Sequence, residues 1–183
     1  MQVRSSYAQI SLNQESVLPL SLHSVAEIVQ VDSPDYTLEE IIKKENSLDF
    51  HALENSITDL GFTDQTYWLR FSLENNSDQS QTYYLETARP ITDVAHLYQL
   101  HQGKIISDQL SGDLIKFADR PFNHRKIIFP ITLPAGSKSD FYIKYQSDGE
   151  VISLPLVLND TSSLVSSSFF NQLIFGFFYG VLF

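Results

Sequence analysis

The stretch Tyr67-Trp68-Leu69-Arg70-Phe71-Ser72-Leu73 decides the fold, because its side chains alternate in character along the chain. Each odd-numbered position holds a large apolar or aromatic residue, whereas the even-numbered positions hold Trp68, Arg70 and Ser72. Successive side chains of a β-strand point to opposite faces of its sheet. A period of two therefore predicts a strand whose odd-numbered side chains enter a core.

Other short segments of strand-like composition lie on both sides of this stretch, at a spacing of about ten residues. The expected strands are residues 17–20, 26–31, 82–87, 92–100, 104–107, 125–131, 141–146 and 151–158. Residues typical of turns separate them, as at 75–78 and 133–136. Many short strands with few helices favour an antiparallel β-sandwich or jelly roll over a parallel α/β sheet.

One short helix is expected after Thr37. Thr37 and Glu40 form a capping box, in which the hydroxyl and the carboxylate each accept a backbone N–H at the helix start. Leu38, Ile41 and Ile42 then make an apolar stripe. We expect about two turns of helix, packed across the end of a sheet.

Composition limits the function classes. The chain has 183 residues, a net charge of −10 and a pI of about 4.7. This charge argues against nucleic-acid binding, which requires clustered Lys and Arg. The chain has no cysteine, so it has neither disulfides nor thiolate metal sites. Sequence motifs of hydrolases, metalloproteases, P-loop enzymes and dinucleotide-binding enzymes are absent, so we do not expect an enzyme.

Residues 169–183 read FFNQLIFGFFYGVLF and contain seven aromatic residues and no charge. Fifteen helical residues reach roughly 22 Å, against a bilayer core of about 30 Å. We interpret the segment as the beginning of a first transmembrane helix; the alternative is a helix buried in the core. The expected division is an N-terminal segment 1–14, a domain 15–159, a Ser-rich linker 160–168 and the start of the membrane helix at 169–183.

Several short phrases occur in an order that resembles a known family. They are Tyr67-Trp68-Leu69-Arg70-Phe71, residues 86–90, Asp93, Leu97-Tyr98, Gly112-Asp113, Arg120-Pro121, His124-Arg125, Phe129-Pro130, Leu133-Pro134-Ala135-Gly136, Leu154-Pro155-Leu156 and Phe177-Phe178-Tyr179-Gly180. Together they resemble the second type of extracellular sensor domain of bacterial seven-transmembrane receptors with diverse intracellular signalling modules, over about residues 15–183. Ala95 departs from the pattern, because a larger apolar residue is usual there.

The resemblance implies a periplasmic jelly-roll domain similar to carbohydrate-binding modules, carried by a receptor in the bacterial inner membrane. It also implies six further membrane helices and a cytoplasmic output module beyond this chain. Carbohydrates, and calcium in some members, are the ligands proposed for the family.

The residues themselves suggest ligand contacts. An indole such as Trp68 can stack on a sugar ring, and a guanidinium such as Arg70 can bind hydroxyls or a carboxylate. Alternatively, the N-terminal segment covers this face, and Arg70 is paired there with an acid such as Glu86 or Asp93. The candidate ligand-binding residues are Trp68, Arg70, Asp93, Arg120, His124 and Arg125.

The loop 119–125 contributes three of these candidates, Arg120, His124 and Arg125, around Pro121. One interpretation is a clamp for an anion or a sugar, because binding residues often lie on loops at the end of a sandwich. The other is that the arginines tie the loop to the sheet through backbone carbonyls.

Calcium binds six to eight oxygen atoms, and acidic turns could supply some of them. The candidate metal ligands are Glu74 and Asp78 after the central strand, and Asp148 in a later turn. No EF-hand spacing is present. We expect that the domain requires no cofactor, and Ca²⁺ is the one candidate ion.

These observations predict an extracytoplasmic ligand-sensing domain that binds a small carbohydrate-like ligand and signals through membrane helices. The expected partners are that ligand and the lipid bilayer. The alternatives are a calcium sensor or a protein-interaction module that forms homodimers, and a membrane-tethered carbohydrate enzyme is a third.

Overall fold

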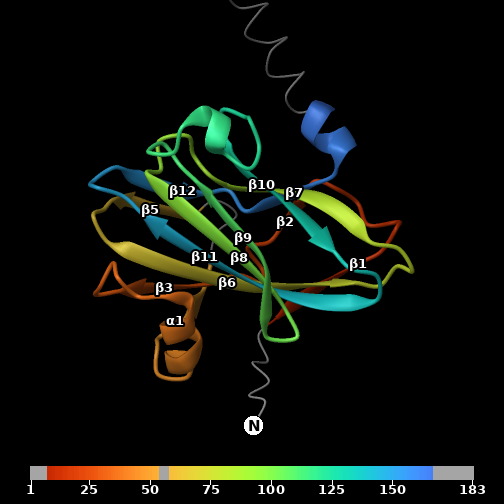
Figure 1. Ribbon diagram of the computed structural model, residues 1–183, viewed down its shortest axis with the longest axis horizontal. Helices are drawn as coiled ribbons and strands as arrows, with labels where there is room; N and C mark the ends of the chain where they lie inside the picture. The colour runs from red at the N-terminus through yellow and green to blue at the C-terminus, as the bar shows by residue number, and fades with distance from the viewer. Residues whose placement is uncertain (1–7, 54–57, 167–183) are drawn as a thin grey trace, which may run out of the picture.

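The protein is a mainly antiparallel β-sandwich in a computed structural model that describes residues 8–53 and 58–166 (Figure 1). The larger sheet contains β1 (Gln9–Leu12), β3 (Glu27–Val31), β4 (His51–Ala52), β6 (Thr66–Asn75), β8 (Val94–His101), β9 (Lys104–Ser111) and β11 (Ser137–Gln146). The smaller sheet contains β2 (Leu20–Ser21), β7 (Gln81–Ala88), β10 (Ile127–Leu133) and β13 (Val157–Asn159). A third, two-stranded sheet pairs β5 (Thr58–Phe62) with β12 (Val151–Leu154).

The strand order of the larger sheet is β4-β3-β6-β11-β8-β9, and that of the smaller sheet is β10-β7-β13-β2. β6 lies inside the larger sheet, and β11 pairs with one side of it. Its first half pairs with β3 and its second half with β1, which runs parallel to it. The expected antiparallel sandwich is therefore confirmed, with this one parallel pair as an exception.

The alternating stretch forms the middle of β6 and behaves as its period predicts. Leu69, Phe71 and Leu73 are fully buried in the core between the sheets. Phe71 stacks on Phe141 of the neighbouring β11, with 4.9 Å between ring centroids. Ring pairs at this separation add attraction beyond the burial of apolar area, so this contact fixes β6 and β11 at the centre of the core.

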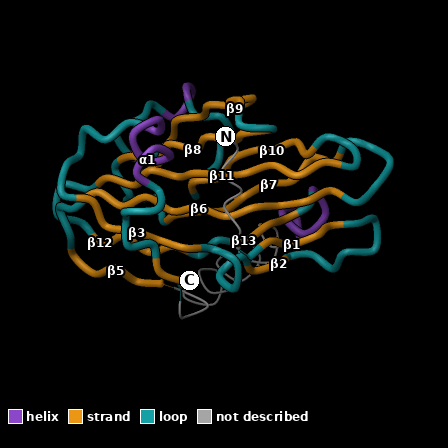
Figure 2. Tube along the Cα trace, turned by 90° about the horizontal axis from the view of Figure 1, so that it is seen from below, coloured by secondary structure: helices purple, strands orange, loops and turns teal. Residues whose placement is uncertain are grey.

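The outer face of the larger sheet is covered by α1 (Leu38–Lys44), which lies over one end of that sheet (Figure 2). Thr37 and Glu40 form the expected capping box. A second apolar cluster fills the space beneath the helix and comprises Val29, Val31, Leu38, Ile41, Trp68, Leu100 and Tyr142. Ile42, expected in the same apolar stripe, is instead 38% exposed.

Three strands lie where the sequence predicts none, namely β1, β4 and β5. The single strand expected over 151–158 is also wrong, because β12 and β13 are separate strands in different sheets. β1 and β4 are short and partly polar, and they join the sheet through backbone hydrogen bonds rather than through an apolar pattern. Since β1 pairs with β6, the larger sheet begins before residue 15, where the sequence places the start of the domain.

The expected linker 160–168 is helical over 161–166. The Asp160 carboxylate accepts the backbone N–H of Ser163 (2.7 Å) and the hydroxyl of Ser162 (2.8 Å), which lowers the pKa of Asp160. This arrangement is an N-cap, so the serines that suggest a flexible linker instead start a helix. The expected membrane segment 169–183 lies outside the described residues, among which no helix is long and apolar enough to cross a membrane.

The buried His23 joins the chain just after β2 to the end of β12. Its Nε2 donates to the carbonyl of Leu154 (2.9 Å), and its Nδ1 accepts from the hydroxyl of Ser21 (2.8 Å). Both bonds suit the neutral ring, which is only 5% exposed. Burial lowers the pKa of His23 below the usual 6.5.

We expect the folded state to lose stability as the pH falls below about 6.5, because the unfolded chain then binds a proton that folded His23 resists. One such group changes the free energy of unfolding by at most about 1.4 kcal/mol per pH unit. His23→Gln should flatten this slope in thermal melts at a series of pH values. The matched control is His51→Gln at an exposed position, which should keep the slope; an unchanged slope in His23→Gln would refute the assignment.

Candidate functional site

The segment 112–126 leaves β9 and folds over the sandwich, and its base is held by a close backbone contact. Gly112 has a φ of 140°, and a Cβ there would lie 2.1 Å from the carbonyl oxygen of Asp93. The backbone N–H groups of Asp113 and Leu114 donate to the carbonyls of Thr92 and Asp93. Only glycine permits this approach, so the segment starts from a defined position.

Arg120 braces the same segment. Its Nε donates to the carbonyl of Ile115 (3.2 Å), and its Nη2 lies 4.0 Å from the carboxylate of Asp113. The short helix η1 (Phe117–Asp119) lies between these residues, and the guanidinium carbon of Arg120 is 5.7 Å from the centre of the Phe117 ring. Arg120 therefore bonds a backbone carbonyl, as the second interpretation of the sequence expects, but that carbonyl belongs to its own segment and not to the sheet.

An aromatic group lies where the segment crosses the smaller sheet. Tyr83 and Leu85 of β7 point into the core, so Tyr84 points outward from the same strand. The ring of Phe122 tilts against Tyr84 at 5.2 Å between centroids, and the ring of His124 lies 6.2 Å from Phe122. Three flat rings thus gather on the outer face of the smaller sheet.

Charged groups accompany these rings. Lys126 Nζ lies 2.8 and 2.9 Å from the two carboxylate oxygens of Glu86, which points outward from β7 on the same face as Tyr84. The backbone N–H of Lys126 donates to Nδ1 of His124 (3.1 Å), so the neutral ring carries its proton on Nε2. Burial, and then the nearby charges of Lys126 and Arg125, lower the pKa of His124. His124 is therefore a neutral donor near pH 7.

We call the five residues Tyr84, Glu86, Phe122, His124 and Lys126 the Phe122 face. It combines ring surfaces with an N–H donor, an ammonium group and a carboxylate. Such a set matches a ligand that has both apolar C–H faces and hydroxyl groups. Of the predicted ligand-binding residues, only His124 belongs to it; Arg120 braces the segment and Arg125 is exposed beside it.

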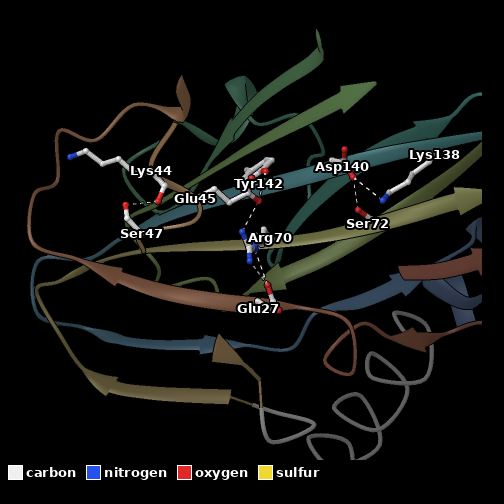
Figure 3. A network of polar contacts seen from close by, with 9 residues as sticks. All are labelled: Glu27, Lys44, Glu45, Ser47, Arg70, Ser72, Lys138, Asp140 and Tyr142. Atoms are coloured by element: carbon white, nitrogen blue, oxygen red, sulfur yellow. Dashed lines mark hydrogen bonds and ion pairs between the residues drawn. The ribbon is translucent and has the colours of Figure 1, made fainter. Parts of the chain in front are cut away.

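Arg70 lies elsewhere, on the outer face of the larger sheet beneath α1 (Figure 3). Its guanidinium binds Glu27 (2.7 and 2.8 Å) and Glu45 (2.5 Å), and it lies 3.9 Å from the centre of the Phe50 ring. The hydroxyl of Tyr142 donates to the same carboxylate of Glu45. The expected cover by the N-terminal segment and the expected pairing with an acid are both found. The two acids named as examples are wrong, because the partners are Glu27 of β3 and Glu45 after α1.

Trp68 is fully buried under α1 and stacks on Tyr98, with 6.0 Å between centroids. It is a core residue here, so it offers no surface for stacking on a sugar. Asp93 is 8% exposed, and its carboxylate accepts the backbone N–H of Asp148 (2.7 Å). It holds the turn after β11 against the start of β8.

The three candidate metal ligands do not form one site, and Asp78 lies exposed in the turn after β6. Glu74 accepts hydrogen bonds from Gln9 and Ser11 near the end of β6, where Asn75 pairs with Ser137 of β11. Asp148 follows the opposite end of the same β6–β11 pair, so one ion cannot bind Glu74 and Asp148 together. Within the described ranges, no group of three or more His, Asp or Glu side chains is arranged to hold a metal ion.

Comparison with known families supports the resemblance noted above. The family model described as 7TMR-DISM extracellular 2 matches residues 25–160. The chain belongs to this family. It is therefore an extracellular sensor domain of the 7TMR-DISM receptor type, and extracellular domains of this type are parts of membrane receptors.

Two further comparisons do not extend the family assignment. No curated protein matches the chain. Among solved structures, the GH31 α-xylosidase of Xanthomonas citri is similar at 12% identity and a TM-score of 0.34, over 74% of this chain and 13% of that one. The 7TMR-DISM chain thus spans a small part of the length of the xylosidase.

Sequence reasoning missed Tyr84, Glu86, Phe122 and Lys126 in this 7TMR-DISM domain. A signal for two of them was present, because alternation within residues 82–87 places Tyr84 and Glu86 on one face of a strand. Phe122 lies within the loop that the sequence singles out for its charges. Its contact with Tyr84 joins residues 38 positions apart and has no local signature.

Replacing Arg70 with Met should strongly destabilise the domain, because Glu27 and Glu45 would then lie beneath α1 without their cation. Breaking such an ion pair typically costs about 3–5 kcal/mol, and the partial exposure of Glu27 favours the lower end of this range. Urea unfolding of Arg70→Met against Arg125→Met, an exposed control, measures the difference. Equal stability of the two variants would contradict the role assigned to Arg70.

Trp68 is the only tryptophan, so its fluorescence reports on its burial directly. We expect an emission maximum well to the blue of that of the urea-unfolded chain, with little quenching by iodide, because α1 excludes water from the ring. Sugars added to the folded domain should leave this emission unchanged. Quenching as strong as in the unfolded chain would show that the ring is accessible after all.

Proposed function

We propose that this domain senses a carbohydrate-like small ligand outside the cytoplasm and passes the signal into the membrane part of its receptor. The ligand binds at the Phe122 face, where a sugar ring stacks on Phe122 and Tyr84. Its hydroxyl groups bind Nε2 of His124 and the Glu86–Lys126 pair. The domain has a binding role and no catalytic one.

The position of this face beside the start of the last described helix is the observation that carries the proposal. Tyr84 pairs with Asn159 across the β7–β13 ladder, and the helix capped by Asp160 follows at once. The Ser163 hydroxyl donates to the Asn159 side chain (3.5 Å), which joins the helix to the strand. A ligand against Tyr84 therefore sits one strand away from the segment that leaves the domain.

Several finer features belong to the same proposal. The sandwich is of the jelly-roll type and faces the periplasm, and residues 169–183 begin the first transmembrane helix in the bacterial inner membrane. The family assignment and the uncharged, aromatic sequence of that segment support this arrangement. The ligand acts by favouring one of two orientations of the helix that begins at residue 161, and its effect is limited by its differential affinity for them.

A thermal-shift screen of the chain in detergent tests the proposal, using neutral oligosaccharides, uronic acid oligomers and Ca²⁺ with and without a chelator. A ligand that binds only the folded state raises the melting temperature. Phe122→Ala should weaken binding of the active sugar about tenfold, in line with about 1.4 kcal/mol for a lost ring contact. Phe62→Ala is the matched control, because Phe62 is 85% exposed on β5 and should bind normally.

The other outcomes of the screen are distinct. A shift caused by Ca²⁺ and reversed by the chelator would indicate a calcium sensor. Mass that rises with protein concentration, with no ligand shift, would indicate an interaction module. Release of free sugar from a polysaccharide would indicate an enzyme, and each of these results contradicts the proposal.

A further inference from the structure

The η1 region carries apolar side chains that are exposed to solvent. Leu114 is 72% exposed and Phe117 is 54% exposed, and Lys116 between them is exposed as well. We call these three residues the η1 patch. Single exposed apolar residues are ordinary, but a leucine and a phenylalanine that flank a lysine form a small amphipathic surface.

The charge of this region differs in sign from that of the rest of the chain. Segment 112–126 contains four Lys or Arg residues and two Asp residues, a net charge of +2 in a chain of −10. Two of these cations, Lys116 and Arg125, are exposed. Cations near apolar side chains are attracted to anionic lipid headgroups, whereas an acidic protein surface is repelled by them.

The position of the patch in the fold indicates what it binds. Figure 1 shows η1 and the helix over 161–166 on the same side of the sandwich, beyond β7 and β10, whereas α1 lies on the opposite side. Val165 of that helix is also 60% exposed. If the chain enters the bilayer after this helix, as the proposed function requires, the side that carries the η1 patch faces lipid.

We propose that the η1 patch docks on the anionic surface of the bilayer, with Phe117 and Leu114 at the headgroup level and Lys116 among the lipid phosphates. This inference rests on the proposed receptor function and adds a second contact between the domain and the membrane. The base of the segment is tied to Thr92 and Asp93 just before β8, and Arg120 braces the segment internally, so docking orients the whole domain. Three residues of the Phe122 face, Phe122, His124 and Lys126, belong to the same segment, so a ligand bound there acts on a domain whose tilt is restrained at two points.

A single cysteine tests the docking, because the chain has no cysteine of its own and a fluorophore attaches at one position only. The full chain carrying Phe117→Cys is reconstituted into vesicles that contain phosphatidylglycerol and a headgroup spin-labelled lipid. The matched control is Ile42→Cys on α1, a moderately exposed position on the far side of the sandwich. Melting temperatures equal to that of the parent show that both variants fold.

We expect the label at position 117 to be quenched and the label at position 42 not to be quenched. Lys116→Glu should reduce the quenching, whereas Lys43→Glu on α1 should leave it unchanged. Raising the ionic strength from about 0.01 M to about 1 M should also weaken it, because the screening length falls from about 30 Å to about 3 Å.

Equal quenching at the two positions, or none at position 117 in a chain that floats with the vesicles, would overturn the docking while leaving the receptor function intact. A chain that does not float with the vesicles would overturn both. Excimer emission from pyrene at position 117 would show that a second copy covers the patch, and would also overturn the lipid contact.

Discussion

Burial of β6 on both faces is the constraint on which the rest of the structure depends. Its odd-numbered side chains fill the core between the sheets, and Trp68 fills a second core beneath α1. A strand of this kind requires a layer on each side, because one exposed face would leave either Trp68 or Phe71 in water. The smaller sheet supplies one layer, and the connection 32–50 between β3 and β4, which includes α1, supplies the other.

The same constraint explains the chemistry around Arg70. A guanidinium on a covered face has lost most of its water and must be compensated by charge and hydrogen bonds. Glu27 comes from the neighbouring strand β3 and Glu45 from the end of α1, so the ion pairs tie β6 both to the strand beside it and to the helix that covers it. The charge is therefore a structural part of this layer, and the larger sheet has no free surface at Trp68 for a ligand.

The parts of the fold that could be predicted are those in which neighbouring residues carry the information. The alternation in β6 and the capping box at Thr37 are local patterns, and both describe the structure correctly. β1 could not be predicted, because its pairing with β6 joins residues more than sixty positions apart through backbone groups alone. The partners of Arg70 were missed for a similar reason, since the acids near it in space come from separate elements.

The candidate site was harder still to predict, because its contacts also join residues that are distant in the sequence. His124 and Arg120 belong to one loop, yet His124 lies against a ring cluster and Arg120 bonds the carbonyl of Ile115. This division depends on where the loop crosses the smaller sheet. Because α1 already occupies the outer face of the larger sheet at Trp68, the outer face of the smaller sheet is the surface on which loop residues and strand residues can meet. β13 belongs to this smaller sheet and leads directly into the helix at residue 161. A ligand at the proposed site would lie next to the helix that begins at residue 161, whereas a ligand at Arg70 would lie on the outer face of the other sheet.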